Sequence, residues 1–350
     1  MSQTIPASPS RTRRWFFRLL TAAIGLAALA FLVSRIDPDA LGRALREADY
    51  RFFALSLLTA FASQFLPGYR WRVLLDYRAP YRTCWSATFV GNFLSVFTPF
   101  RMGDVARAGL LRRSDKVPLT EGLTTVLFGQ LLDLSGMMIV GLLLVALAPL
   151  PDTLNRIAFV LALVVLGGLG MLYIVAHSEG VWEKRIEPIL RRFLGVGPAR
   201  RIVGLIRSGI DGLRILHRPA QFIYVIALTL FFWSLVCLAG WFLVRSLVPD
   251  AAPVFGVGLA FAAGIGMATP WLPGSLGTYE LSVAFGMTAL GLSEEMALAI
   301  VVMLRLRFVL VVVGTGILGM WAQGMSFNAL RAAAEEGTAE ENAVIEEAAI

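Results

Sequence analysis

The sequence predicts an all-α polytopic membrane protein, and three observations support this fold class. Of the 350 residues, 57% are hydrophobic and only 16% are charged, whereas soluble domains carry roughly 25% charged residues. The mean hydropathy is +0.72. Apolar runs of about 18 to 25 residues recur along the chain, and a helix of that length spans the hydrocarbon core of a bilayer. We therefore expect about eight hydrophobic elements in a single transmembrane domain, about residues 15 to 325.

The first element is expected at about 15 to 34, after a short cytoplasmic N-terminus, residues 1–14. Several arginines lie before it or at its start, namely Arg11, Arg13, Arg14 and Arg18. Because basic residues collect on the cytoplasmic side of a membrane, this span should begin inside. The same pattern resembles an export signal, but more apolar sequence follows at the position of a cleavage site. We therefore favour a retained span.

The next elements turn at the cytoplasmic side. A helix is expected at about 51 to 68, and basic residues follow it: Arg70, Arg72, Arg78 and Arg82. The apolar run at about 84 to 100 is followed by a second basic stretch, so a full crossing would leave one basic cluster outside. A re-entrant hairpin that enters and leaves at the cytoplasmic face keeps both clusters inside.

The rest of the chain continues the alternation. Helices are expected at about 119 to 148 and about 156 to 176. The arginine-rich linker 177–220 has apolar residues at helical spacing, which fits an amphipathic helix on the inner membrane face and a solvated linker helix equally well. A span at about 221 to 244 then leads to a second broken segment at about 254 to 293.

The final helix, at about 295 to 324, should end in the cytoplasm. The tail at 326–350 is acidic, and after Arg331 it contains no lysine or arginine. Its low apolar content predicts a disordered extension.

The two halves of the domain, about 50–148 and 221–324, show the same order of span, broken segment and long span. The first half begins outside and the second inside, so we predict inverted repeats. In transport proteins this design places the binding site at the interface of the repeats. Matching positions of the two broken segments supply the backbone breaks: Pro99 and Gly103 in the first, and Pro273, Gly274 and Gly277 in the second.

Both broken segments carry charged residues beside these breaks. Exposed to lipid, each unpaired backbone group would cost several kcal/mol, so the segments should line a cavity inside the protein. Asp104 and Arg107 are three residues apart and share a helix face, and an arginine fork suits phosphate oxygens. Ordinary positive-inside charge is the alternative for Arg101 and Arg107. Glu280 follows Gly277, where a carboxylate favours the helix dipole, and capping alone would also explain it.

Two long helices each place a charge near the bilayer midplane, because Asp133 and Arg307 lie about a dozen residues into their helices. Such a charge costs roughly 2.5 to 3.5 kcal/mol on insertion scales, so it should be paired or hydrated. Two interpretations stay open. Asp133 forms a fixed salt bridge with Arg305 or Arg307 that joins the halves, or one arginine meets a substrate phosphate. The candidate headgroup-binding residues are Arg70, Arg101, Asp104, Arg107, Asp133, Glu280, Arg305 and Arg307.

Enzyme chemistry is not expected from these patterns. The two cysteines and two histidines are isolated, so they predict neither a disulfide framework nor a metal site. Neither a catalytic triad nor a phosphate-binding loop is evident, and we expect no cofactor. The formal net charge of +7 is explained by orientation and anionic lipids rather than by nucleic acid.

The stretches SVFTPFRMGDVAR and PWLPGSLGTYE, together with Arg70, resemble the flippase-like transmembrane family, which is the family of the membrane domain of lysylphosphatidylglycerol synthetase. The resemblance covers about residues 15–325. It implies a multi-pass protein of the bacterial or archaeal inner membrane that moves a polar lipid between leaflets. The synthetases also carry a C-terminal cytoplasmic acyltransferase domain. Because this chain ends in a tail of about 25 residues, we expect that it does not aminoacylate a lipid.

The sequence thus favours a lipid flippase-like protein of the bacterial inner membrane, with both termini in the cytoplasm and membrane phospholipids as partners. The anionic headgroup should bind where Arg101, Arg107 and Glu280 meet the group of Asp133, Arg305 and Arg307. One alternative is a non-transporting membrane partner of a lipid- or envelope-synthesis enzyme. The other is a membrane-embedded glycosyl- or phospho-transferase, which would need acidic residues on a sizeable outer loop.

Overall fold

The computed structural model describes residues 38–97, 103–148, 218–267 and 275–324, with scattered helical positions between 156 and 188. These residues form helices joined by turns, and no strand occurs among them. Helices long and apolar enough to cross a membrane occupy Tyr50–Leu74, Leu119–Leu147, Pro219–Arg245 and Glu294–Gln323. The all-α polytopic fold class is therefore confirmed. The predictions for the first span, the 156–176 span, the basic linker and the acidic tail fall wholly or largely outside the described residues.

The first described elements are α2 (Pro38–Glu47), α3 (Tyr50–Ser63) and α4 (Phe65–Leu74). The carboxylate of Asp49 caps α3 by accepting a hydrogen bond from the backbone N–H of Arg51 at 2.9 Å. Helices α3 and α4 together form one span that continues beyond residue 68, where the sequence predicted its end. Arg70 and Arg72 therefore lie within a helix rather than after it, and Arg70 is buried.

Each broken segment is a hairpin of two short helices. The first consists of α5 (Tyr81–Phe97) and α6 (Gly103–Asp115), and the second of α12 (Val254–Met267) and α13 (Thr278–Ala289). At 1.5 Å per residue these helices are about 18 to 26 Å long, less than the roughly 30 Å of a bilayer core. Within each hairpin the two helices pack against each other. The connecting residues 98–102 and 268–274 lie outside the described part.

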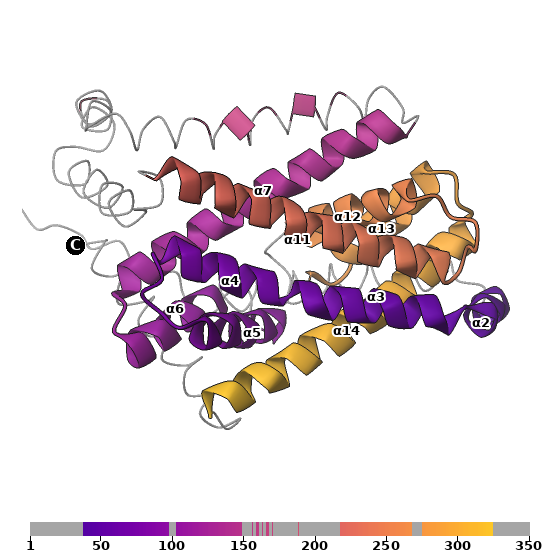
Figure 1. Cartoon of the computed structure of the whole chain (residues 1–350). Helices are drawn as coiled ribbons and strands as arrows, with labels where there is room; N and C mark the ends of the chain where they lie inside the picture. The colour runs from indigo at the N-terminus through magenta and orange to yellow at the C-terminus, as the bar shows by residue number, and fades with distance from the viewer. Residues whose placement is uncertain are drawn as a thin grey trace, which may run out of the picture.

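The two hairpins open toward opposite ends of the bundle (Figure 1). At one end, Arg78 pairs with Glu121 at 2.8 Å and Arg218 pairs with Asp76 at 2.8 Å. These pairs join the end of α4 to the starts of α7 (Leu119–Leu147) and α11 (Pro219–Arg245). We call it the basic end, and the α5/α6 hairpin opens there. The basic residues of its turns and helix ends are Arg78, Arg82, Arg112, Arg113, Lys116 and Arg218.

At the opposite end the backbone N–H of Asp49 donates to the carbonyl of Ser246 at 2.8 Å, which joins the start of α3 to the end of α11. The indole of Trp241 donates to the carbonyl of Ala251 at 2.8 Å, beside the start of α12. The α12/α13 hairpin therefore opens at this end, from which α14 (Glu294–Gln323) runs back. Elements of the two halves run in opposite directions, as inverted repeats require.

The halves also interlock. Helix α5 packs on α14 of the other half, where the amide of Gln323 donates to the hydroxyl of Ser86 at 2.8 Å. Helix α12 packs on α7, and Met137 and Leu144 share an apolar cluster with Val257. The broken segment of each half is thus supported by the long helix of the other half, and the space between them belongs to both.

Candidate functional site

A cavity of about 430 Å³ lies between the two halves and is lined by side chains from both. This volume falls within the range of roughly 300–1,000 Å³ typical of small-molecule sites. Several residues that the sequence singled out line this cavity, namely Arg70, Asp104, Arg107, Asp133 and Arg307. The tertiary structure therefore brings most of the described candidate charges to one place.

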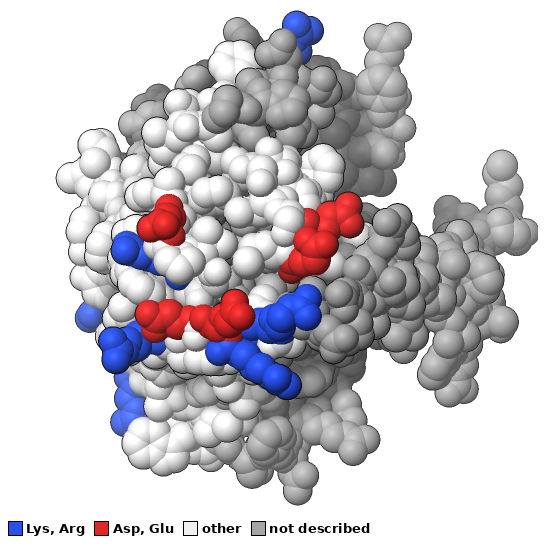
Figure 2. Space-filling view, turned by 90° about the vertical axis from the view of Figure 1, so that its right-hand side faces the viewer, with Lys and Arg blue, Asp and Glu red and all other residues white. Residues whose placement is uncertain are grey.

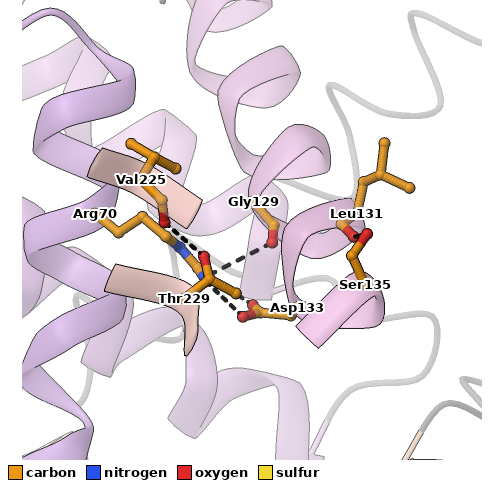
Figure 3. A network of polar contacts seen from close by, with 7 residues as sticks. All are labelled: Arg70, Gly129, Leu131, Asp133, Ser135, Val225 and Thr229. Atoms are coloured by element: carbon orange, nitrogen blue, oxygen red, sulfur yellow. Dashed lines mark hydrogen bonds and ion pairs between the residues drawn. The ribbon is translucent and has the colours of Figure 1, made fainter. Parts of the chain in front are cut away.

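Arg70 and Asp133 form the best-defined contact of the cavity wall (Figure 3). The two terminal nitrogens of Arg70 donate to the two carboxylate oxygens of Asp133, each at 2.7 Å, in the bidentate geometry that guanidinium favours. Nη1 also donates to the hydroxyl of Thr229 at 3.1 Å. Arg70 thus ties α4 to α7 and α11. Its side chain is 5% exposed and that of Asp133 is 38% exposed, so the carboxylate is the member of the pair that is open to the cavity.

A second ion pair lies at the start of α6. Arg107 Nη2 donates to Asp104 Oδ1 at 2.8 Å, as the spacing of three residues allows, and Asp104 also accepts from the amide of Gln130 on α7. The guanidinium of Arg107 lies 5.3 Å from the ring centroid of Trp71, a cation–π contact. Because Asp104 is in the first turn of α6, the helix dipole also stabilises its charge.

Glu280 has two partners. Its Oε2 accepts from the backbone N–H of Gly277 at 2.8 Å and caps α13. Its Oε1 accepts from Arg305 Nε at 2.7 Å. The Arg305 guanidinium lies over the rings of Tyr279 and Phe308, 5.0 and 5.3 Å from their centroids. Capping and charge pairing therefore both hold Glu280 in place. Tyr279 and Phe308 line the cavity, whereas the Glu280–Arg305 pair does not.

Arg307 has a different environment from the other arginines. Its Nη1 donates to the hydroxyl of Ser56 at 2.7 Å and to the carbonyl of Ala239 at 2.9 Å. The Ser56 hydroxyl also donates to that carbonyl, at 2.6 Å. Among the described residues Arg307 forms no ion pair with a carboxylate. A charge near the centre of a bilayer costs about 2.5–3.5 kcal/mol on insertion scales, so an arginine in a membrane span without a carboxylate partner is a candidate functional residue.

The predicted salt bridge between Asp133 and Arg305 or Arg307 is not formed. Asp133 pairs with Arg70, and Arg305 pairs with Glu280. The physical reason is the length of α4, whose last turns carry Arg70 into the protein interior. Because basic residues collect on the cytoplasmic side, the sequence predicted that Arg70 lies after the end of the span, where it could not reach Asp133.

The described residues show part of the predicted convergence of the two broken segments. Arg107, Asp133 and Arg307 line one cavity, and the Glu280–Arg305 pair holds the cavity-lining rings of Tyr279 and Phe308 from behind. Gly103 begins α6 and Gly277 caps α13. Four candidates lie in stretches that the structure does not describe: Pro99, Arg101, Pro273 and Gly274.

Sequence reasoning missed the polar side chains that orient these charges. Thr229 and Ser56 are buried in apolar helices, at 3% and 0% exposure, and each binds a cavity arginine. Gln130 binds Asp104. A hydroxyl or amide inside an otherwise apolar span could have signalled a partner, because a buried polar group needs one.

Fold and site together define a class of protein, a multi-pass α-helical membrane protein with two oppositely directed hairpins around a charged cavity. The chain belongs to the family of the lysylphosphatidylglycerol synthase transmembrane region, whose family model matches residues 18–316. The resemblance drawn from the sequence motifs is thereby confirmed.

A curated relative is a protein named Glycosyltransferase AglD from Haloferax volcanii. It is 27% identical over 311 residues, which cover 78% of this chain and 49% of the relative. The chain therefore spans about half the length of that relative.

Proposed function

We propose that the protein binds the anionic headgroup of a membrane phospholipid in the cavity between its repeats and moves it between the two leaflets. The observation that carries this proposal is the cavity itself, lined by Arg70, Arg107 and Arg307 inside a bundle of apolar helices. A phosphate cannot cross the hydrocarbon core without replacement of its hydration shell. Guanidinium groups replace it well, since their planar fork donates to two phosphate oxygens at once.

The carboxylates paired with the cavity arginines are compatible with reversible binding of a headgroup. Asp133 and Asp104 compensate the charges of Arg70 and Arg107, so among the described lining residues the charge of Arg307 alone has no carboxylate partner. Guanidinium has five N–H donors, so an arginine can keep its carboxylate and still bind a phosphate oxygen. The two hairpins enter from opposite ends, and in inverted-repeat transporters rocking of the halves exposes such a site to each side in turn. The acyl chains remain in the bilayer.

We further propose that the basic end faces the cytoplasm of a bacterial cell and that the membrane is the inner membrane, with both termini cytoplasmic. Lysine and arginine concentrate on the cytoplasmic side, and the turns of the basic end are rich in them. The opposite end presents acidic and basic side chains close together (Figure 2).

The test is exchange of fluorescent phospholipids in proteoliposomes, followed by quenching of the outer leaflet. We expect the wild-type protein to accelerate exchange of an anionic lipid over protein-free vesicles. Arg107→Ala should slow it by about tenfold, since a charged hydrogen bond is worth about 1.5–3 kcal/mol. The control variant Arg218→Ala changes an arginine at the basic end outside the cavity, and it should leave the exchange rate unchanged. Equal exchange in wild-type and empty vesicles would refute transport, and lipid binding without exchange would favour the non-transporting partner of a synthesis enzyme.

A second candidate, a glycosyltransferase, is favoured by the name of the curated relative. The site fits it less well. Asp104, Asp133 and Glu280 are each engaged in an ion pair with an arginine, so no unpaired carboxylate remains among the described residues of the cavity lining. We therefore propose that this chain is not itself an enzyme. Transfer of labelled sugar from a nucleotide sugar to membrane lipid by the purified protein would overturn that view.

A further inference from the structure

The charges that line the cavity do not cancel. Arg70 is matched by Asp133 and Arg107 by Asp104, at 2.7 and 2.8 Å. Arg307 is the remaining charged side chain among the described residues of the lining. The described wall therefore presents two neutral pairs and one uncompensated positive charge.

The guanidinium of Arg307 is also held in a fixed position at the cavity, where it can bind an anionic ligand. One terminal nitrogen is fixed by Ser56 and Ala239. Its other two nitrogens have no hydrogen-bond partner among the described residues and are not buried unsatisfied atoms, and Arg307 is part of the cavity lining. Ser56 is fully buried and holds the guanidinium in one orientation. A binding group that is fixed in advance loses little freedom when it takes up a ligand.

Three aromatic rings at the cavity bear on the charge of the ligand. Cationic headgroups are recognised by open aromatic faces. In this cavity Arg107 lies over Trp71, and Arg305 lies over Tyr279 and Phe308. These three rings are already in contact with protein cations. The lining also contains two further aromatic residues, Phe232 and Trp233. A cationic headgroup is therefore disfavoured by the guanidinium groups that it would meet beside the three rings.

We propose that Arg307 sets the charge selectivity of the cavity, which takes a phospholipid headgroup of one net negative charge through its phosphodiester and discriminates against cationic, aminoacylated headgroups. The proposal rests on the proposed function, because it assigns a ligand class to the same cavity. A zwitterionic headgroup brings the same phosphodiester, but its ammonium group must lie near the arginines, so it ranks between the two.

The test measures selectivity rather than rate alone. Wild type, Arg307→Gln, Arg307→Lys and the control Arg218→Gln are reconstituted, and exchange is compared for acyl-labelled phosphatidylglycerol, phosphatidylcholine and lysyl-phosphatidylglycerol. In wild type we expect phosphatidylglycerol to exchange about tenfold faster than the lysyl lipid, since one charged hydrogen bond is worth about that factor. Arg307→Gln should bring the ratio close to one, and Arg307→Lys should restore most of it. Arg218→Gln should keep the wild-type ratio.

Two results would overturn the assignment, namely an unchanged ratio in Arg307→Gln or a wild type that prefers the lysyl lipid. Binding of short-chain phosphatidylglycerol to each protein in detergent separates this proposal from transport. Binding that needs a cation at position 307, without any exchange, would refute transport and keep the selectivity assignment. Arg307→Lys keeps the charge, so the comparison remains decisive if Arg307→Gln fails to fold.

Discussion

Two buried arginine–carboxylate pairs in the described part of the chain each join a buried side chain to a more exposed one. In the first pair Arg70 is the hidden partner and Asp133 borders the cavity, and in another Glu280 is 4% exposed while Arg305 is 22% exposed. The hidden member fixes the position of the other, because burying a charge is tolerated only when its partner stays in place. We therefore expect Arg70 to position Asp133 in addition to lining the cavity, and Glu280 to position Arg305.

Replacing Asp133 by Asn should lower the free energy of unfolding by about 3 kcal/mol, because it leaves Arg70 buried without a counter-charge. Denaturant unfolding in detergent micelles measures this loss. The matched control is Asp76→Asn, whose partner Arg218 is 55% exposed, and it should cost less than about 1 kcal/mol. The double variant Arg70→Met with Asp133→Leu should recover part of the loss. Equal effects of the two single variants would contradict a buried pair.

The two roles of Glu280 can be separated by substitution. Gln keeps an oxygen that accepts from the Gly277 N–H but loses the charge that binds Arg305, whereas Ala loses both. We expect Glu280→Ala to be less stable than Glu280→Gln by about 1 kcal/mol, the value of a helix cap. Thermal unfolding of both purified variants measures the difference. Identical stabilities would mean that the cap contributes nothing.

At the scale of elements, the α5/α6 hairpin depends on a close approach of two backbones. A Cβ atom on Gly103 would lie 1.8 Å from the carbonyl oxygen of Gly91, and one on Gly91 would lie 2.6 Å from the carbonyl oxygen of Gly103. In the other hairpin, Gly266 approaches the backbone of Tyr279 in the same way, at 2.6 Å. Small residues at these crossings bring the start of each second helix, with its carboxylate, close to the protein centre.

Gly103→Ala should therefore lower the free energy of unfolding by about 1–3 kcal/mol or more, since the added methyl group must push α5 and α6 apart. Gly109 provides the control on the same helix, because a Cβ atom there meets nothing within 4 Å. Gly109→Ala should be neutral or stabilising by up to about 1 kcal/mol, from helix propensity alone. The denaturant midpoints of unfolding of the two variants, compared with wild type, measure the difference. A tolerated alanine at 103 would show that the helices are not packed this closely.

At the scale of the whole molecule, the two halves run in opposite directions, so a different hairpin opens at each end. The cavity at the centre is lined by both halves. The long helices α7 and α14 each support the hairpin of the other half. A displacement of one half therefore moves the hairpin wall of the cavity relative to the other half. Under the proposed transport function, we expect such a displacement to expose the central site to each end of the bundle in turn.

The two ends should be accessible from opposite sides of the membrane. Ser114 at the basic end and Glu294 at the opposite end are both exposed. In a background without Cys84 and Cys237, an impermeant maleimide should label Glu294→Cys in intact cells and Ser114→Cys only after permeabilisation. Labelling of both from one side would contradict the two hairpins as arranged here.

The sequence by itself determined the helical class, the family, the two broken segments and the spans that the structure describes, apart from the end of the span that begins at Tyr50. Hydrophobic length and Pro/Gly breaks are local properties, and a bilayer allows few ways to satisfy them. The sequence also singled out all five charged residues of the described cavity lining. Asp133 and Arg307 were evident because charge in an apolar span is rare, and the other three because they lie beside broken segments or in the family motifs. The sequence could not assign their partners.

Only the tertiary structure decided which arginine meets which carboxylate. Arg70 and Asp133 are 63 residues apart in the chain, and their contact depends on the continuation of α4 past residue 68 and on the rotation of α4 against α7. The same holds for Arg307, whose partners Ser56 and Ala239 come from two other helices. Hydropathy sets where a helix lies along the membrane normal but not how it is rotated, and rotation is fixed by packing between the halves.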